Sequence, residues 1–179
     1  MNKSLGPDLF NSMSNGIAIN KSNYDNGALV PNPLFDELAS NRDAYTEIYS
    51  SIGFDLKARK NFFYMSDKSV DLFPDVAMKI AALLDILARK MAAIPLFSEA
   101  LLDSSAGLPK AKVVEFDRDD EVKLILAACG MKGGLLTSVE NIMVGRKIAY
   151  WNRLDALVLT DAGIQLFDDL FADEDGVGS

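Results

Sequence analysis

Histidine is absent from this chain of 179 residues, and cysteine occurs once. Histidine is the most frequent general base and metal ligand in proteins, and structural zinc sites need several cysteine or histidine ligands. Cys129 has no second cysteine for an internal disulfide and no histidine to activate it. The usual nucleophilic triads and zinc sites are therefore excluded, and Cys129 is expected to be a small buried residue in a reducing compartment. We expect no enzymatic activity and no cofactor.

Long apolar runs are also missing. The longest, near Ile80–Leu87, is interrupted by Asp85, whereas a helix needs about 20 apolar residues to cross a bilayer. The first residues lack the apolar core of a signal peptide. Apolar residues make up 49% of the chain and charged residues 25%, as in folded soluble proteins. We therefore expect a cytoplasmic protein without membrane association, folded as one medium domain or two small ones.

Basic residues are missing from the end of the chain. The final nineteen residues contain six acidic residues and no lysine or arginine, although the whole chain has a net charge of only −8. Such an acidic segment repels nucleic acid and membrane surfaces, which favours protein partners. We expect residues 173–179 to form an acidic tail. Residues 1–30, rich in Asn, Ser and Gly, are expected to form a flexible arm with a short ordered piece at Gly16–Asn20.

The stretch after this arm has the pattern of a helix leading into a β-hairpin. Asn32-Pro33 is typical of a helix start, and apolar residues recur at helical spacing as far as Ile52. Gly53 suits the end of that helix. Two strand-like segments, Phe54–Leu56 and Phe62–Met65, then flank a polar loop. A helix that leads into a hairpin is the closing half of a winged-helix unit. Both faces of this hairpin are apolar, which predicts that one face packs against a second domain or a partner.

The remaining residues predict a second helical unit. The elements expected there are a helix over Val76–Met91, a shorter helix over Leu96–Ser104, a strand at Val113–Phe116, a helix over Glu121–Cys129, a helix from Ser138 to about Asp155, a strand at Leu157–Leu159 and a last helix from Thr160. The second strand of its hairpin is expected to be missing or very short. The predicted fold is mainly α with small β-hairpins (α+β). It consists of tandem winged-helix domains, a reduced unit over residues 31–70 and a second unit over residues 71–172.

Candidate binding residues lie on the two predicted hairpin regions. An aromatic side chain on an exposed hairpin is a natural anchor for a partner chain. The candidates for a partner interface are Phe62, Phe63, Tyr64 and Trp151. Basic side chains there could contact phosphates, against the plainer alternative of a solvated surface. The candidates for DNA contact are Lys57, Arg59 and Lys60 at the first hairpin, and Arg146, Lys147 and Arg153 on the predicted helix before the second.

Two further patterns have plain structural explanations. Lys132-Gly133-Gly134 lacks the spacing of a phosphate-binding loop and is expected to be a turn. Adjacent carboxylates such as Asp119 and Asp120 diverge by about 100° on a helix, so they do not converge on one site. Helix capping explains them.

Several motifs follow one another in a familiar order: Asn32-Pro33-Leu34-Phe35, Phe62-Phe63-Tyr64-Met65, Leu72-Phe73-Pro74 and the apolar stripe of Val76–Met91. This order resembles the MukE/MksE family, the tandem winged-helix (KITE) subunits of bacterial condensins. Asn152-Arg153-Leu154 is similar to the "N-R-L" of that family's second recognition-type helix. The resemblance covers residues 32–91 and, more loosely, 121–171. The chain is shorter than typical members, and its second hairpin is reduced.

The resemblance implies a non-enzymatic accessory subunit of a condensin. Such subunits form homodimers and bind a kleisin (MukF- or MksF-like), which bridges the ATPase heads of an SMC-like protein. A nucleoid-associated protein that influences head engagement and chromosome organisation would follow, with weak DNA contact inside the complex. The alternative is a stand-alone dimeric winged-helix transcriptional regulator, which the acidic end opposes. A small enzyme of unknown type has the least support.

Overall fold

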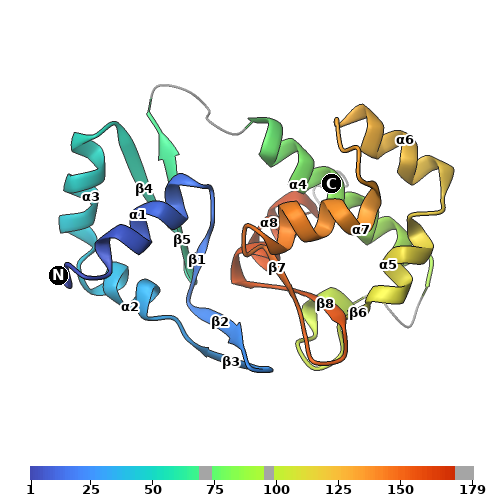
Figure 1. Cartoon of the computed structure of the whole chain (residues 1–179), viewed down its shortest axis with the longest axis horizontal. Coiled ribbons are helices and arrows are strands. Elements are labelled where there is room, and N and C mark those ends of the chain that lie inside the picture. The colour runs from blue at the N-terminus through green and yellow to red at the C-terminus, as the bar shows by residue number, and fades with distance from the viewer. Residues whose placement is uncertain (69–73, 95–98, 172–179) are drawn as a thin grey trace, which may run out of the picture. The chain divides into compact units, whose positions relative to one another are not determined.

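The computed structural model describes residues 1–68, 74–94 and 99–171. The chain divides into two compact units, Met1–Pro74 and Asp75–Ser179. Helices and small antiparallel sheets build both units, which confirms the predicted α+β class (Figure 1). No helix in the described ranges is long and apolar enough to cross a membrane.

The first unit combines helices with two small sheets. In chain order its elements are α1 (Gly6–Ser14), β1 (Ile19–Asn20), β2 (Ser22–Asp25), β3 (Ala28–Pro31), α2 (Pro33–Ser40), α3 (Arg42–Ser51), β4 (Phe54–Ala58) and β5 (Phe62–Asp67). One sheet has the strand order β1–β5–β4, and β2 and β3 form a second, two-stranded sheet. We call the β2–β3 pair the ribbon and the β4–β5 pair the first hairpin.

The core of the first unit lies between its helices and one face of the β1–β5–β4 sheet. Alternate side chains of β5 point to opposite faces, so Phe63 and Met65 enter this core together. Each large apolar side chain buried in it contributes roughly 1.5–3 kcal/mol. The buried cluster comprises Leu9, Met13, Ile19, Leu38, Tyr45, Tyr49, Leu56, Phe63 and Met65.

The expectation of a flexible N-terminal arm is wrong, because helix α1 and strands β1, β2 and β3 lie within residues 6–31. Leu9 and Met13 lie four residues apart on one face of α1 and are fully buried. Ile19 then pairs with Phe63, which adds β1 to the sheet. Burial of these apolar residues outweighs the polar composition of the segment.

The predicted helix over residues 32–52 is in fact two helices. Asn32 caps α2 as expected, because its Oδ1 accepts a hydrogen bond from the Leu34 N–H at 3.1 Å. Asn41, with φ −127°, separates α2 from α3. The first hairpin follows as predicted, after Gly53 with φ +91°. Its strands are longer than expected, so that the loop shrinks to residues 59–61.

The second unit contains a long helix, several short ones and a three-stranded sheet. Its elements are α4 (Pro74–Ala92), the 3₁₀ turn η2 (Ala100–Leu102), β6 (Leu108–Pro109), α5 (Lys110–Phe116), α6 (Asp120–Ala128), α7 (Gly134–Ser138), the π-helix η3 (Val139–Val144), β7 (Ala149–Trp151), β8 (Ala156–Leu159) and α8 (Asp161–Phe171). The sheet has the order β6–β8–β7. We call the β7–β8 pair the second hairpin.

Several predictions for this unit need correction. The strand expected at Val113–Phe116 is helix α5, whose buried Val113 and Phe116 have the i, i+3 spacing of a helix. The helix expected from Ser138 to Asp155 ends at Val144, and Ser138 lies inside it rather than at its N-cap. The second hairpin has both of its strands, of which one was expected to be missing or very short; the unpredicted strand β7 has three residues. Part of the helix expected over residues 96–104 lies outside the described residues, as do residues 72 and 73 of the family motif.

The two units share one order of elements. In each, a helix is followed by a short strand, then by further helices and an antiparallel hairpin. The short strand pairs with the second strand of the hairpin, β1 with β5 and β6 with β8. The ribbon is an addition to this plan: it is inserted between β1 and α2, whereas β6 continues directly into α5.

Candidate partner-binding surfaces

The aromatic residues of the first hairpin lie on both faces of strand β5. Phe63 is 4% exposed and packs in the core, with its ring centroid 5.1 Å from that of Phe35. Phe62 and Tyr64 lie on the opposite face with stacked rings 5.9 Å apart. Phe62 is buried and Tyr64 is half-buried. Tyr64 is thus the aromatic residue of this group that offers surface to a partner, and contact by any of the three stays a prediction.

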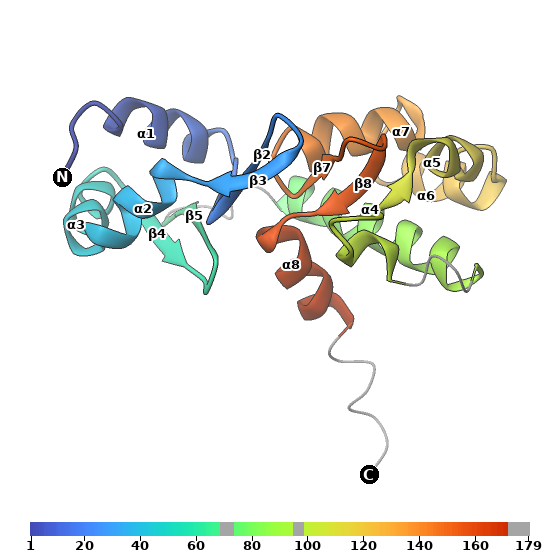
Figure 2. The same ribbon diagram turned by 90° about the horizontal axis from the view of Figure 1, so that it is seen from below.

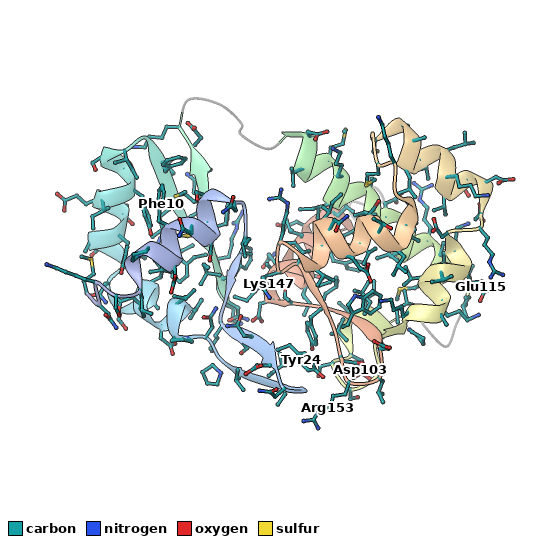
Figure 3. All side chains as sticks on the ribbon, in the orientation of Figure 1. Phe10, Tyr24, Asp103, Glu115, Lys147 and Arg153 are labelled. Carbon is teal, nitrogen blue, oxygen red and sulfur yellow. The ribbon has the colours of Figure 1, made fainter. Side chains whose placement is uncertain are left out.

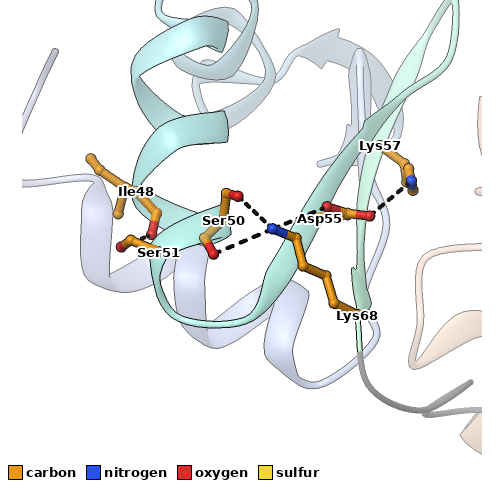
Figure 4. Close-up of polar contacts among 6 residues, drawn as sticks. All are labelled: Ile48, Ser50, Ser51, Asp55, Lys57 and Lys68. Carbon is orange, nitrogen blue, oxygen red and sulfur yellow. Dashed lines mark hydrogen bonds and ion pairs between the residues drawn. The ribbon is translucent and has the colours of Figure 1, made fainter.

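The basic residues of the first hairpin differ in how they are held. Lys57 forms an ion pair with Asp55, with Nζ 3.1 Å from Oδ2, and Lys68 approaches the other carboxylate oxygen at 3.8 Å. Lys68 also donates a hydrogen bond to Ser50 at the end of α3 (Figure 4). These contacts connect α3 to the base of the hairpin. Arg59 and Lys60 are exposed in the loop at the other end, where they are available for phosphate contact.

Trp151 is the last residue of strand β7, next to the turn of the second hairpin. Its side chain is half-buried in β7, and the indole N–H is buried with no hydrogen-bond partner among the described residues. The Lys110 ammonium lies 5.0 Å from the centroid of the Trp151 ring, within cation–π range. Lys110 also donates a hydrogen bond to Glu140 Oε1 at 2.7 Å, which is the main reason that the pKa of Lys110 is raised. This ion pair fixes the cation over the ring.

Asn152 builds the turn of the second hairpin. Its Oδ1 accepts hydrogen bonds from the N–H groups of Leu154 and Ala156, and its Nδ2 donates to the Ala106 carbonyl at 3.1 Å. The "N-R-L" motif is therefore a hairpin turn and not the end of a recognition helix. The turn holds Leu154 in solvent with 69% of its surface exposed. Leu154 was missing from the binding residues predicted from the sequence. An apolar residue within a polar turn is the sequence signal that could have identified it.

The second predicted basic cluster does not lie on one helix. Arg146 and Lys147 precede β7, whereas Arg153 follows it in the hairpin turn. Lys147 and Arg153 consequently lie at opposite ends of the strand (Figure 3). Lys147 also has φ +62°, at the point where the chain turns from the π-helix into β7. DNA contact by these three residues stays a prediction. They do not share one helix face, although the sequence had indicated that they would.

The glycine-rich segment at residues 132–134 meets a carboxylate. Asp117 Oδ1 accepts a hydrogen bond from the Leu135 N–H at 2.7 Å, at the start of α7. A Cβ on Gly134 would lie 2.7 Å from Asp117 Oδ2. The segment is therefore a turn packed against the Asp117 carboxylate, as expected. Cys129 is half-buried, and the described residues contain no group of three or more Cys, Asp or Glu side chains that could hold a metal ion.

The family model of the condensin complex protein MksE matches residues 4–143. The chain belongs to the MksE family. No curated protein matches the chain closely enough to add to this assignment. The resemblance predicted from the sequence is thereby confirmed, and the chain is a condensin complex protein by family. The MksE match includes α1, the ribbon and the first hairpin, and it ends within η3, before the second hairpin.

Proposed function

We propose that the protein is a non-enzymatic accessory subunit of a bacterial condensin. It forms a homodimer and binds a kleisin of the MukF/MksF type, which connects it to an SMC-like ATPase. Through the kleisin it influences engagement of the ATPase heads and chromosome organisation in the nucleoid. The observation that carries this proposal is the MksE match over residues 4–143.

We further propose that the two units are tandem winged-helix domains. The shared order of helix, strand, helices and hairpin supports this, as does the matching order of strands in the two sheets. In this plan α3 and the α7–η3 helix take the position of the recognition helix, directly before each hairpin. The hairpins then correspond to the wings.

The second hairpin is the stronger candidate for kleisin contact. Leu154 and Arg153 are exposed at its tip, and Trp151 lies in the adjacent strand. An exposed leucine next to an aromatic side chain and an arginine has the composition of a binding hot spot with a polar rim. In the first hairpin, Tyr64 is the proposed contact, and Phe62 and Phe63 support it from within the fold. Arg59 and Lys60 are the proposed sites of weak DNA contact inside the complex.

The test is the mass of the protein by size-exclusion chromatography with light scattering, alone and mixed with the kleisin-like product of a neighbouring gene. A dimer that moves into a stable larger complex is the expected result. A protein that ignores the kleisin but retards duplex DNA in a strongly salt-dependent manner would contradict the proposal and favour the transcriptional regulator.

A pair of matched variants then locates the contact. Leu154→Ser removes the exposed leucine of the second hairpin, and Leu124→Ser removes one from α6 that is 72% exposed. Neither change opens a cavity, so both variants are expected to keep the stability of the wild type. We expect Leu154→Ser to weaken the kleisin complex and Leu124→Ser to leave it unchanged. Equal binding by both variants would exclude the second hairpin as the contact.

A further inference from the structure

The ribbon is an extra element that the fold of the first unit holds firmly at one end. The Lys21 N–H, just before β2, donates a hydrogen bond to the Asn61 carbonyl at 2.8 Å. The Asn32 N–H donates to the Lys21 carbonyl at 3.0 Å, and the buried Asn32 side chain donates to the Asn20 carbonyl at 2.7 Å. From this anchored base the two strands extend away from α1, α2 and α3 (Figures 1 and 2).

The register of the ribbon determines which backbone groups face outward. Pro31 has no N–H to donate and the Asn32 N–H bonds to the Lys21 carbonyl, so Ser22 and Pro31 form a non-hydrogen-bonded pair of the antiparallel ladder. Pairs alternate along such a ladder, so Val30 points its N–H and C=O toward Asn23, whereas Leu29 points both groups away from β2. On the outer edge of β3, Leu29 therefore presents a donor and an acceptor that no other described residue pairs with.

The outer edge of β3 lacks the usual protection of an edge strand. All four of its residues are exposed, Leu29 by 52% and Val30 by 36%, and none of them is charged. Natural edges are normally covered or carry lysine, and a two-stranded sheet of this size is marginally stable without a third strand. Pro31 blunts only the far end of the strand, because its nitrogen carries no hydrogen.

We propose that an extended apolar segment of the kleisin adds to the outer edge of β3 as a third strand of the ribbon. The inference rests on the proposed function, which supplies the partner. Hydrogen bonds to the outward N–H and C=O of Leu29 fix the register of the added strand. The kleisin residue that lies beside Leu29 has an uncharged side chain. This mode of recognition uses backbone pairing for affinity and alternate side chains for specificity.

The length of β3 argues for a partner chain rather than for a second copy of this protein. Four residues span roughly 13 Å. A stable dimer buries about 1,200 Å² or more in total, which two paired strands of this length cannot supply alone. A longer partner that also contacts the protein elsewhere can add such a short strand as one of several contacts.

The experiment compares kleisin binding by the full-length wild type, Leu29→Pro and Leu29→Ala. Proline removes the outward N–H without touching the ladder to β2, so the ribbon itself is retained. Alanine keeps the N–H and truncates the side chain. We expect Leu29→Pro to weaken binding by about tenfold, as the loss of one backbone hydrogen bond implies, and Leu29→Ala by clearly less. Thermal unfolding and circular dichroism check that both variants keep the fold.

The outcomes separate the two proposals. If the wild type binds the kleisin and Leu29→Pro binds equally well, strand addition is overturned while the proposed function stands. Equal weakening by proline and alanine would assign the contact to the side chain alone and also overturn strand addition. If Leu29→Pro dissociates the homodimer and leaves kleisin binding intact, the occupant is a second copy. A wild type that does not bind the kleisin overturns both proposals.

Discussion

Gly163, the third residue of α8, is required by a close backbone approach. A Cβ at this position would lie 2.1 Å from the Ile148 carbonyl oxygen, at the start of the second hairpin. Alanine normally stabilises a helix by about 1 kcal/mol relative to glycine. Here we expect the opposite sign: Gly163→Ala lowers the free energy of unfolding by about 3 kcal/mol, because the backbone must shift. Urea denaturation measures this. Gly6→Ala in α1, with no heavy atom within 4 Å of the added Cβ, is the control and should be neutral or stabilising.

Tyr49 carries a hydroxyl group that the fold does not use. Its side chain is 3% exposed, and the hydroxyl has no hydrogen-bond partner among the described residues. Burial, and then the neighbouring Tyr45, raise the pKa of Tyr49 to about 12. We expect Tyr49→Phe to leave the free energy of unfolding within about 0.5 kcal/mol of the wild type or to increase it, since an unpaired polar group is removed. Tyr45→Phe loses a hydrogen bond to Glu37 at 3.1 Å and should cost about 1 kcal/mol. Greater damage from Tyr49→Phe would contradict the structure.

The Lys90 ammonium of α4 forms ion pairs with Asp119 and Glu121 at the start of α6, and their effect depends on pH. The Lys90 ammonium donates to Asp119 Oδ2 at 2.6 Å, and Asp119 also caps α6 through the Glu121 N–H. Mainly because of Lys90, the pKa of Asp119 is lowered, and the same contact raises the pKa of Lys90. A lowered pKa stabilises the fold fully above the unfolded value, about 3.9, and this stabilisation is lost as the pH falls through the folded value. The raised pKa of Lys90 stabilises the fold fully below the unfolded pKa of lysine, about 10.4. This stabilisation is lost as the pH rises through the pKa of Lys90 in the folded state.

The variant Asp119→Asn removes the ion pair between Lys90 and Asp119 but keeps the helix cap, because asparagine also caps helices well. We expect it to unfold at a lower temperature than the wild type at neutral pH, with a difference that shrinks once the pH falls below about 4. Asp120→Asn is the control, since Asp120 is exposed and its ion pair with Lys123 lies within the same helix. A difference between Asp119→Asn and the wild type that persists unchanged in acid would exclude the charge as its cause.

At the scale of elements, strongly periodic segments could be predicted from the sequence and locally ambiguous ones could not. Gly53 and the apolar alternation after it were sufficient for the first hairpin. The ribbon was missed although Asn26-Gly27, with φ values of +48° and +83°, is the typical two-residue turn of a hairpin. The polar composition of the segment hid that turn.

Strand β7 of the second hairpin was missed for a different reason, although β8 was predicted. Ile148 and Trp151 have the spacing of a helix. Ile148 nevertheless lies directly before β7, and Trp151 is the last residue of that strand. Spacing over so short a run does not separate helix from strand, and only packing against β8 decides. The contacts of Lys110 with Trp151 and Glu140 join residues 30 to 41 positions apart, and no local pattern announces them.

At the scale of the whole molecule, the first unit has a core of its own. Every member of the buried cluster from Leu9 to Met65 lies within residues 1–74. We therefore expect the fragment 1–74 to fold by itself, with helical circular dichroism and a cooperative thermal transition. A domain of this size is only marginally stable, so its transition should lie below that of the full chain. A fragment with native-like helix content but no cooperative transition would show that the core needs the second unit.

Trp151, with the Lys110 ammonium over its ring, makes the second hairpin visible by fluorescence. The chain contains a single tryptophan, so all indole emission comes from this one strand. Emission should change when a partner covers the tip or when Lys110 leaves the ring. The first unit, which has no tryptophan, contributes no indole emission in the same experiment. Unlabelled protein can thus report, in real time, when a partner reaches the second hairpin.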